Sequence, residues 1–179
     1  MTPSAETPDL RFPIGKRVPP KTFTPELRAA NLKIVEETPA KLRKAVTGLT
    51  DAQLDTPYRP GGWTVRQLVH HVADSHMNAY IRTRLALTED NPPVKPYDEA
   101  KWAELADKTM PIDGSLNIVD AVHARWIHVL RSLNAADFDR TMFHPEHGKI
   151  SLDALLAIYA WHGPHHTAHV TELRKREGF

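Results

Sequence analysis

The chain has 179 residues, and its 23 Lys and Arg against 22 Asp and Glu leave a formal net charge of +1, which gives no long-range attraction to nucleic acid or anionic membranes. The absence of cysteine excludes disulfides, zinc–thiolate sites and a protein thiol nucleophile. No apolar run approaches the ~20 residues of a membrane span or marks a secretory signal, so we expect one cytoplasmic domain over residues 1–179.

The first third of the chain predicts an extended arm followed by a helix. Residues 1–23 carry several prolines and little apolar periodicity, which indicates an extended arm that lies along the domain or is partly disordered. A helix is expected from Thr24, as N-cap, toward Leu49. Pro39 lies inside this helix and should kink or break it.

Three further long helices follow. The second is expected from Thr64, which has capping-box spacing with Gln67, to the proline-rich loop at 90–96. The third is expected over Ser115–Leu133, and a short helix over Tyr97–Ala106 lies between the two. Turn residues within 139–150 predict a loop or small hairpin, and the last helix should run from the Ser151 cap to Glu177. Four amphipathic helices without βαβ alternation predict an all-α four-helix bundle.

The most distinctive stretch is WHGPHHTAHV, residues 161–170, which holds four of the eleven histidines. Successive helical residues advance by about 100°, which places His162 and His166 near the centre of the apolar face of the last helix and His165 and His169 about 60° round on its flank. The i,i+4 spacing of the inward pair suits two ligands of one metal ion, and it suits two hydrogen-bonded core histidines equally well. Pro164 should bend the helix by removing the amide that would bond to Ala160.

Another helix could supply a third ligand. On the second helix His71 lies on a narrow polar stripe of the kind that lines a cavity, whereas His76 lies among apolar residues and His70 points away. Helical geometry therefore favours His71 and predicts that His76 packs in the core. On the third helix His123 faces inward. It could be a fourth metal ligand, a hydrogen-bond partner behind a ligand or a core residue, and we expect a core residue. The loop histidines, His144 and His147, are expected on the surface.

Two long stretches carry a family resemblance: LDTPYRPGGWTVRQLVHHVADSHMNAYIR at 54–82 and YAWHGPHHTAHVTELRKREG at 159–178. They resemble the DinB-like metalloprotein superfamily and especially its YfiT branch of metal-dependent hydrolases, and PIGK at 13–16 and PYDEAKW at 96–102 extend the likeness. The resemblance implies a four-helix bundle, commonly a homodimer, with zinc or nickel held by three histidines. On this sequence those ligands are His71, His162 and His166. Gly163-Pro164 departs from the more ordinary helical residues of that branch.

Function remains open among three interpretations. A metal on three histidines keeps a free coordination position, which favours a hydrolase acting on a small-molecule substrate through activated water. The superfamily also resembles transferases that use a low-molecular-weight thiol such as bacillithiol, and a non-catalytic metal-binding bundle is the third interpretation. The residues expected to support the site are Asn78, Arg82 and Tyr159.

Overall fold

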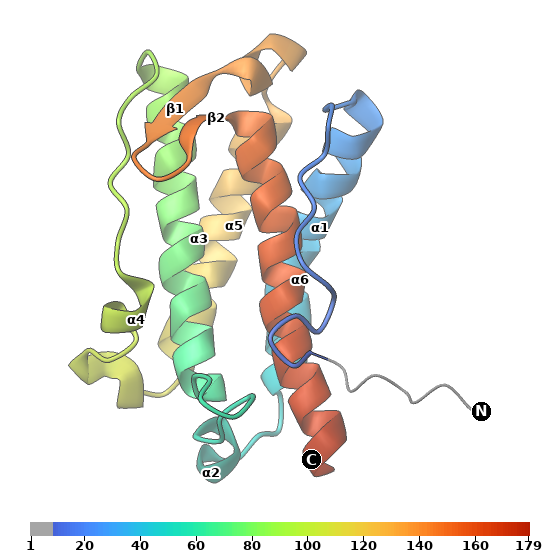
Figure 1. The fold of residues 1–179 in the computed structure, drawn as a ribbon, viewed down its shortest axis with the longest axis vertical. Helices are drawn as coiled ribbons and strands as arrows, with labels where there is room; N and C mark the ends of the chain where they lie inside the picture. The colour runs from blue at the N-terminus through green and yellow to red at the C-terminus, as the bar shows by residue number, and fades with distance from the viewer. Residues whose placement is uncertain (1–8) are drawn as a thin grey trace.

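The computed structural model describes residues 9–179, in which four long helices form a bundle (Figure 1). The long helices are α1 (Pro25–Val46), α3 (Val65–Thr88), α5 (Asp113–Arg131) and α6 (Leu152–Glu177). Each packs on two neighbours, in the ring order α1–α5–α3–α6. The prediction of an all-α four-helix bundle is confirmed. Within residues 9–179, none of the helices is long and apolar enough to cross a membrane.

The connections hold short elements. These are α2 (Asp51–Leu54), α4 (Glu99–Trp102), two 3₁₀ helices, η1 (Ala106–Thr109) and η2 (Ala135–Asp139), and the antiparallel strands β1 (Thr141–His144) and β2 (Gly148–Ser151). The hairpin expected before the last helix is therefore present. The short helix expected over 97–106 is shorter than predicted, since α4 covers four residues. From residue 9 onward the N-terminal segment runs without helix or strand to Thr24, and the part of the predicted arm at residues 1–8 lies outside the described residues.

Side-chain caps define where three long helices begin. The Thr24 hydroxyl accepts the amide of Leu27, and Thr64 forms the expected capping box with Gln67. The Ser151 hydroxyl accepts the amide of Ala154 at the start of α6. Each cap pairs an amide that has no partner within the helix, as the sequence predicted.

The expected break at Pro39 is wrong, because α1 continues through it to Val46. Proline removes one amide, so the carbonyl four residues earlier, at Val35, loses its usual helical partner. That carbonyl instead accepts the Nδ1–H of His123 on α5, at 2.8 Å. The His123 side chain thus replaces the backbone hydrogen bond that Pro39 removes, and α1 remains continuous.

The Gly163-Pro164 pair lies within α6, which also runs unbroken. A Cβ atom on Gly163 would lie 2.6 Å from Cγ2 and 2.7 Å from Oγ1 of Thr38 on α1. Thr38 is buried, and its hydroxyl bonds to the carbonyl of Ile34. Glycine at 163 therefore permits the close approach of α1 and α6.

The apolar core forms two clusters separated by a layer of histidines. One cluster includes Val35, Trp126 and Leu156, and the other includes Leu42, Leu68 and Val170. On every long helix the two clusters occupy different ends. Histidines lie between them: His76 on α3, His123 on α5, and His162 and His166 on α6. Buried polar groups thus gather at mid-height, where they must find partners within the protein.

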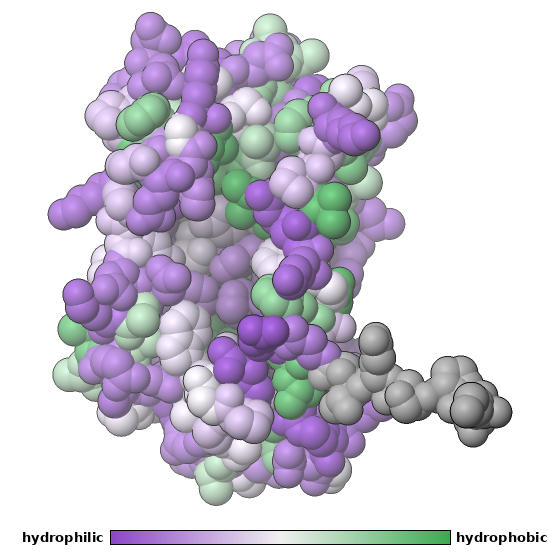
Figure 2. All heavy atoms as spheres, in the orientation of Figure 1, coloured by the Kyte–Doolittle hydropathy of each residue, from purple (hydrophilic) through white to green (hydrophobic). Residues whose placement is uncertain are grey.

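The face viewed in Figure 2 is covered mostly by hydrophilic residues and is hollowed at mid-height, between α3 and α6. The arm crosses in front of α6 on the same face (Figure 1). The hollow lies at the level of the bundle where the histidine layer runs.

Candidate metal centre

Three histidines from two helices converge. One nitrogen each from His71 on α3 and from His162 and His166 on α6 all lie within 4.8 Å of one another. The Nε2 atoms of His71 and His162 are 3.3 Å apart. The pair on α6 meets because residues four apart lie one above the other on a helix face. The structure therefore brings together the three residues that the sequence singled out.

The three imidazoles are held neutral. Burial lowers the pKa of His71 to about 4, and burial together with the neighbouring histidines lowers the pKa of His162 and of His166 well below 6.5. Their lone pairs therefore meet little competition from protons at neutral pH, which is the state that binds a metal.

Two further histidines lie behind His162. Nε2 of His76 is 3.1 Å from Nδ1 of His162, and Nδ1 of His76 is 2.7 Å from Nε2 of His123. His76 is fully buried, as predicted, and burial lowers its pKa well below 6.5 and that of His123 to about 4. His123 lies outside the triad and is buried, in agreement with the core position expected for it.

One residue of the triad borders a small pocket, of about 10 Å³. His71 lines it with Asp74, Tyr97 and Gln67, and the ring of Trp63 lies 4.8 Å from that of His71. Burial raises the pKa of Asp74 to about 6, helped by the nearby charge of Asp107. Asp74 lies three residues after His71, on the same side of the helix.

The three residues expected to support the site have different surroundings. Tyr159 lies beside the triad, with its ring 5.4 Å from that of His162, and its hydroxyl donates to the carbonyl of Ser75 at 3.0 Å. The amide of Asn78 donates to the carbonyl of Asp74, one turn earlier. Arg82 donates to the carbonyl of Lys95. Both of these bonds go to backbone, and of the three residues Tyr159 is the one that packs beside a triad ring.

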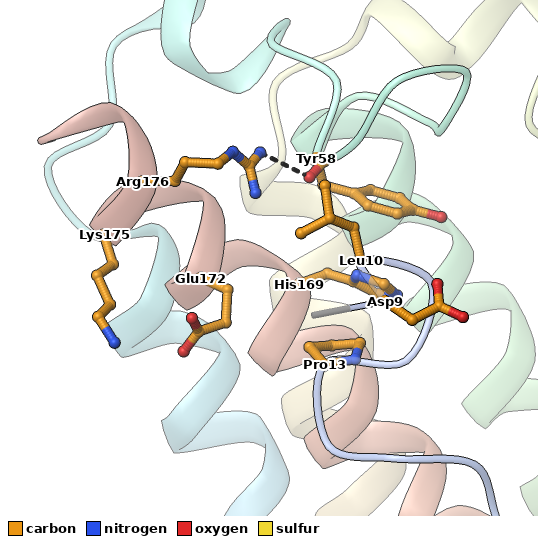
Figure 3. Close-up of a pocket in the computed structure, with 8 residues that line it drawn as sticks. All are labelled: Asp9, Leu10, Pro13, Tyr58, His169, Glu172, Lys175 and Arg176. Atoms are coloured by element: carbon orange, nitrogen blue, oxygen red, sulfur yellow. Dashed lines mark hydrogen bonds between the residues drawn. The ribbon is translucent and has the colours of Figure 1, made fainter. Parts of the chain in front are cut away.

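The flanking pair, His165 and His169, is buried rather than exposed. Their Nε2 atoms lie 3.1 Å apart. The ring of His165 stacks on that of Trp161, and the ring of His169 packs at a tilt against that of Tyr58. His169 also lines a cavity of about 430 Å³ between the arm and the end of α6 (Figure 3). Leu10 and Pro13 of the arm also line it, and Arg176 donates to the carbonyl of Tyr58.

The expectation that His144 lies on the surface is wrong. Only 6% of it is exposed, because the hairpin folds back over the end of the bundle and the ring stacks on that of His147 at 4.6 Å. His144, Glu146 and His147 form a second close group, but its other two members are exposed. His70 bonds to Ser115 and to the carbonyl of Met110, away from the triad as expected.

The donor set fits a divalent transition metal. Three neutral imidazoles suit zinc, nickel, copper or iron. Nδ1 of His166 is buried without a hydrogen-bond partner among the described residues. His71 and His162 are only half-buried, which leaves one side of the triad open to a further ligand.

Fold and site together define a class of protein: a four-helix bundle whose mid-height layer presents three neutral histidines that could hold a metal ion. Residues 34–170 match the DinB superfamily, and the chain belongs to that superfamily. The resemblance seen in the sequence is thereby confirmed.

The chain is also similar to named relatives and to solved structures. Proteins of Bacillus mycoides and Bacillus cereus, each named "Putative metal-dependent hydrolase", are 54% identical over 94% of this chain and 97% of their own. The solved structure of YfiT from Bacillus subtilis, described as a probable metal-dependent hydrolase with an unusual four-helix bundle topology, is 48% identical. Its TM-score is 0.91, over 95% of this chain and 98% of that one. A second solved four-helix bundle protein, 19% identical with a TM-score of 0.57, shares the fold.

Proposed function

We propose that the protein is a metal-dependent hydrolase that acts on a small molecule and binds one divalent ion through His71, His162 and His166. The observation that supports this most is the convergence of three neutral imidazoles from α3 and α6 beside a pocket. Zinc and nickel are the ions we expect. When bound, such an ion supplies a Lewis acid that polarises a carbonyl or phosphoryl oxygen.

The other residues of the pocket would handle the proton. Asp74, with a pKa of about 6, is ionised at neutral pH yet close enough to titration to accept and return a proton. We therefore propose Asp74 as the general base. Trp63, whose ring lies beside that of His71, and Tyr97, which lines the same small pocket as His71, would exclude bulk water from this side of the site.

Metal analysis of single-site variants tests the ligand assignment. His71→Ala, His162→Ala and His166→Ala should each lose stoichiometric zinc or nickel, whereas His128→Ala, an exposed histidine on α5, should retain it. If His166→Ala retained one ion per chain, the proposed site would be wrong.

Turnover tests the reaction. The metal-loaded protein should hydrolyse members of an ester and amide panel, and Asp74→Asn should keep its metal while kcat falls by roughly 10²–10⁴-fold. Parallel reactions with an added low-molecular-weight thiol distinguish thiol transfer. Turnover that depended on the thiol would contradict the hydrolase, and the absence of turnover in every arm would favour a binding bundle.

A further inference from the structure

A single line of hydrogen bonds crosses the bundle and ends at the proposed metal centre. It runs from the carbonyl of Val35 on α1 through His123 on α5 and His76 on α3 to His162 on α6. The three distances along it are 2.8, 2.7 and 3.1 Å. Each of the four long helices contributes one group.

The first group is a carbonyl, and it determines which atom donates in every hydrogen bond of the line. A carbonyl oxygen only accepts, so Nδ1 of His123 must carry a proton. His123 is 2% exposed and His76 is fully buried, and burial disfavours a charged imidazole, so each ring carries one proton. Nε2 of His123 therefore accepts from Nδ1–H of His76. Nε2 of His76 in turn accepts from Nδ1–H of His162, which leaves Nε2 of His162 without a proton.

We propose that His76 and His123 are positioning residues that hold His162 in the tautomer whose Nε2 lone pair faces His71 and the metal. This inference rests on the proposed metal site and adds two residues to it. The same line would fix the orientation of the His162 ring and raise its strength as a ligand. The line begins at a carbonyl that is available because Pro39 lacks the amide that would otherwise bond to it.

The tautomer can be measured without any metal or variant. Long-range ¹H–¹⁵N NMR of the metal-free wild-type protein at neutral pH distinguishes a protonated from an unprotonated ring nitrogen. We expect His76, His123 and His162 to carry their protons on Nδ1. A proton on Nε2 of His162 would overturn the proposal, whatever the protein binds.

Zinc affinity tests the consequence. In a competition titration against a chelator, His123→Phe should weaken zinc binding by about 10- to 100-fold, the usual effect of removing a group behind a ligand. In the metal-free variant the ¹⁵N signals of His162 should show a mixture of tautomers, which loss of packing alone would not produce. His128→Phe, on the exposed face of α5, is the matched control and should bind as wild type.

The outcomes separate the two proposals. If His166→Ala loses the metal while His123→Phe binds zinc as tightly as wild type, the line of hydrogen bonds has no positioning role and the metal site stands. If His166→Ala retains the metal, the site itself is wrong. If His123→Phe does not fold, the NMR measurement of the His162 tautomer in the wild-type protein still tests the positioning role.

Discussion

At the scale of single residues, the environment of each histidine distinguishes it from the others. His71, His162 and His166 lie together, and His71 and His162 are only half-buried. His76 and His123 lie behind them, and His165 and His169 pair with each other. Burial lowers the pKa of all seven, so at neutral pH they act as neutral donors and acceptors.

The buried histidines should make the metal-free protein sensitive to acid. In the unfolded chain His123 takes up a proton below pH 6.5, whereas in the native state it resists protonation until about pH 4. The unfolded state therefore binds more protons between these values, and the free energy of unfolding falls as the pH is lowered through them. By pH 5 the protonation of this residue in the unfolded chain lowers the free energy of unfolding by up to about 2 kcal/mol.

Urea unfolding of the metal-free protein at pH 7 and pH 5 measures this loss. His123→Phe should show a smaller drop in unfolding free energy between the two pH values than wild type does. A drop that is equal in the variant and in wild type would contradict the contribution of His123.

At the scale of helices, two prolines and a glycine lie where helical propensity disfavours them, and packing explains two of the three. Pro39 leaves a carbonyl that His123 uses, and Gly163 lets α6 approach Thr38. Pro164 also lies within continuous helix, and among residues 9–179 the structure shows no partner that explains it.

Gly163→Ala should destabilise the fold, although Gly→Ala inside a helix ordinarily stabilises it. The new Cβ would lie under 3 Å from a buried Thr38 side chain that its β-branch and hydrogen bond hold in place. Overpacking of this kind costs about 1–3 kcal/mol in unfolding free energy.

Gly114→Ala is the matched control, because a Cβ at that position on α5 meets nothing within 4 Å. Denaturant unfolding should rank Gly163→Ala below wild type and Gly114→Ala at or above it. The Thr38→Ala/Gly163→Ala double variant should recover part of the loss, and strict additivity of the two single effects would argue against a clash.

At the scale of the whole molecule, the proposed ion would link α3 to α6 in the layer between the two apolar clusters. A ligand that binds only the native state stabilises it, by about 2.7 kcal/mol at a free concentration 100 times its Kd. For a chain of this size we expect Tm to rise by roughly 5–10 °C.

Thermal unfolding with zinc or nickel, before and after chelation, checks this expectation. His166→Ala should show no rise in Tm. An equal rise in that variant would place the stabilising ion elsewhere, and the group formed by His144, Glu146 and His147 is the first place to look.

The sequence predicts the bundle and its caps because helical periodicity determines which side chains share a face. Periodicity together with the family resemblance predicts the three histidines of the triad. It fails at Pro39 because the hydrogen bond that rescues α1 comes from His123, 84 residues later in the chain, which no local pattern reveals. The buried state of His144 depends in the same way on how the hairpin folds back. The pairing of His76 with His123 requires the spatial order of the helices, which the sequence leaves open.

The line from Val35 to His162 has a mechanical consequence. Apolar packing is non-directional, so two helices can slide past each other by one turn and still bury similar surface. A hydrogen bond to one particular nitrogen does not survive such a slide. Because the line joins α1 to α5, α5 to α3 and α3 to α6, and Gly163 against Thr38 brings α6 back to α1, it encircles the bundle and fixes the axial register of all four helices at once.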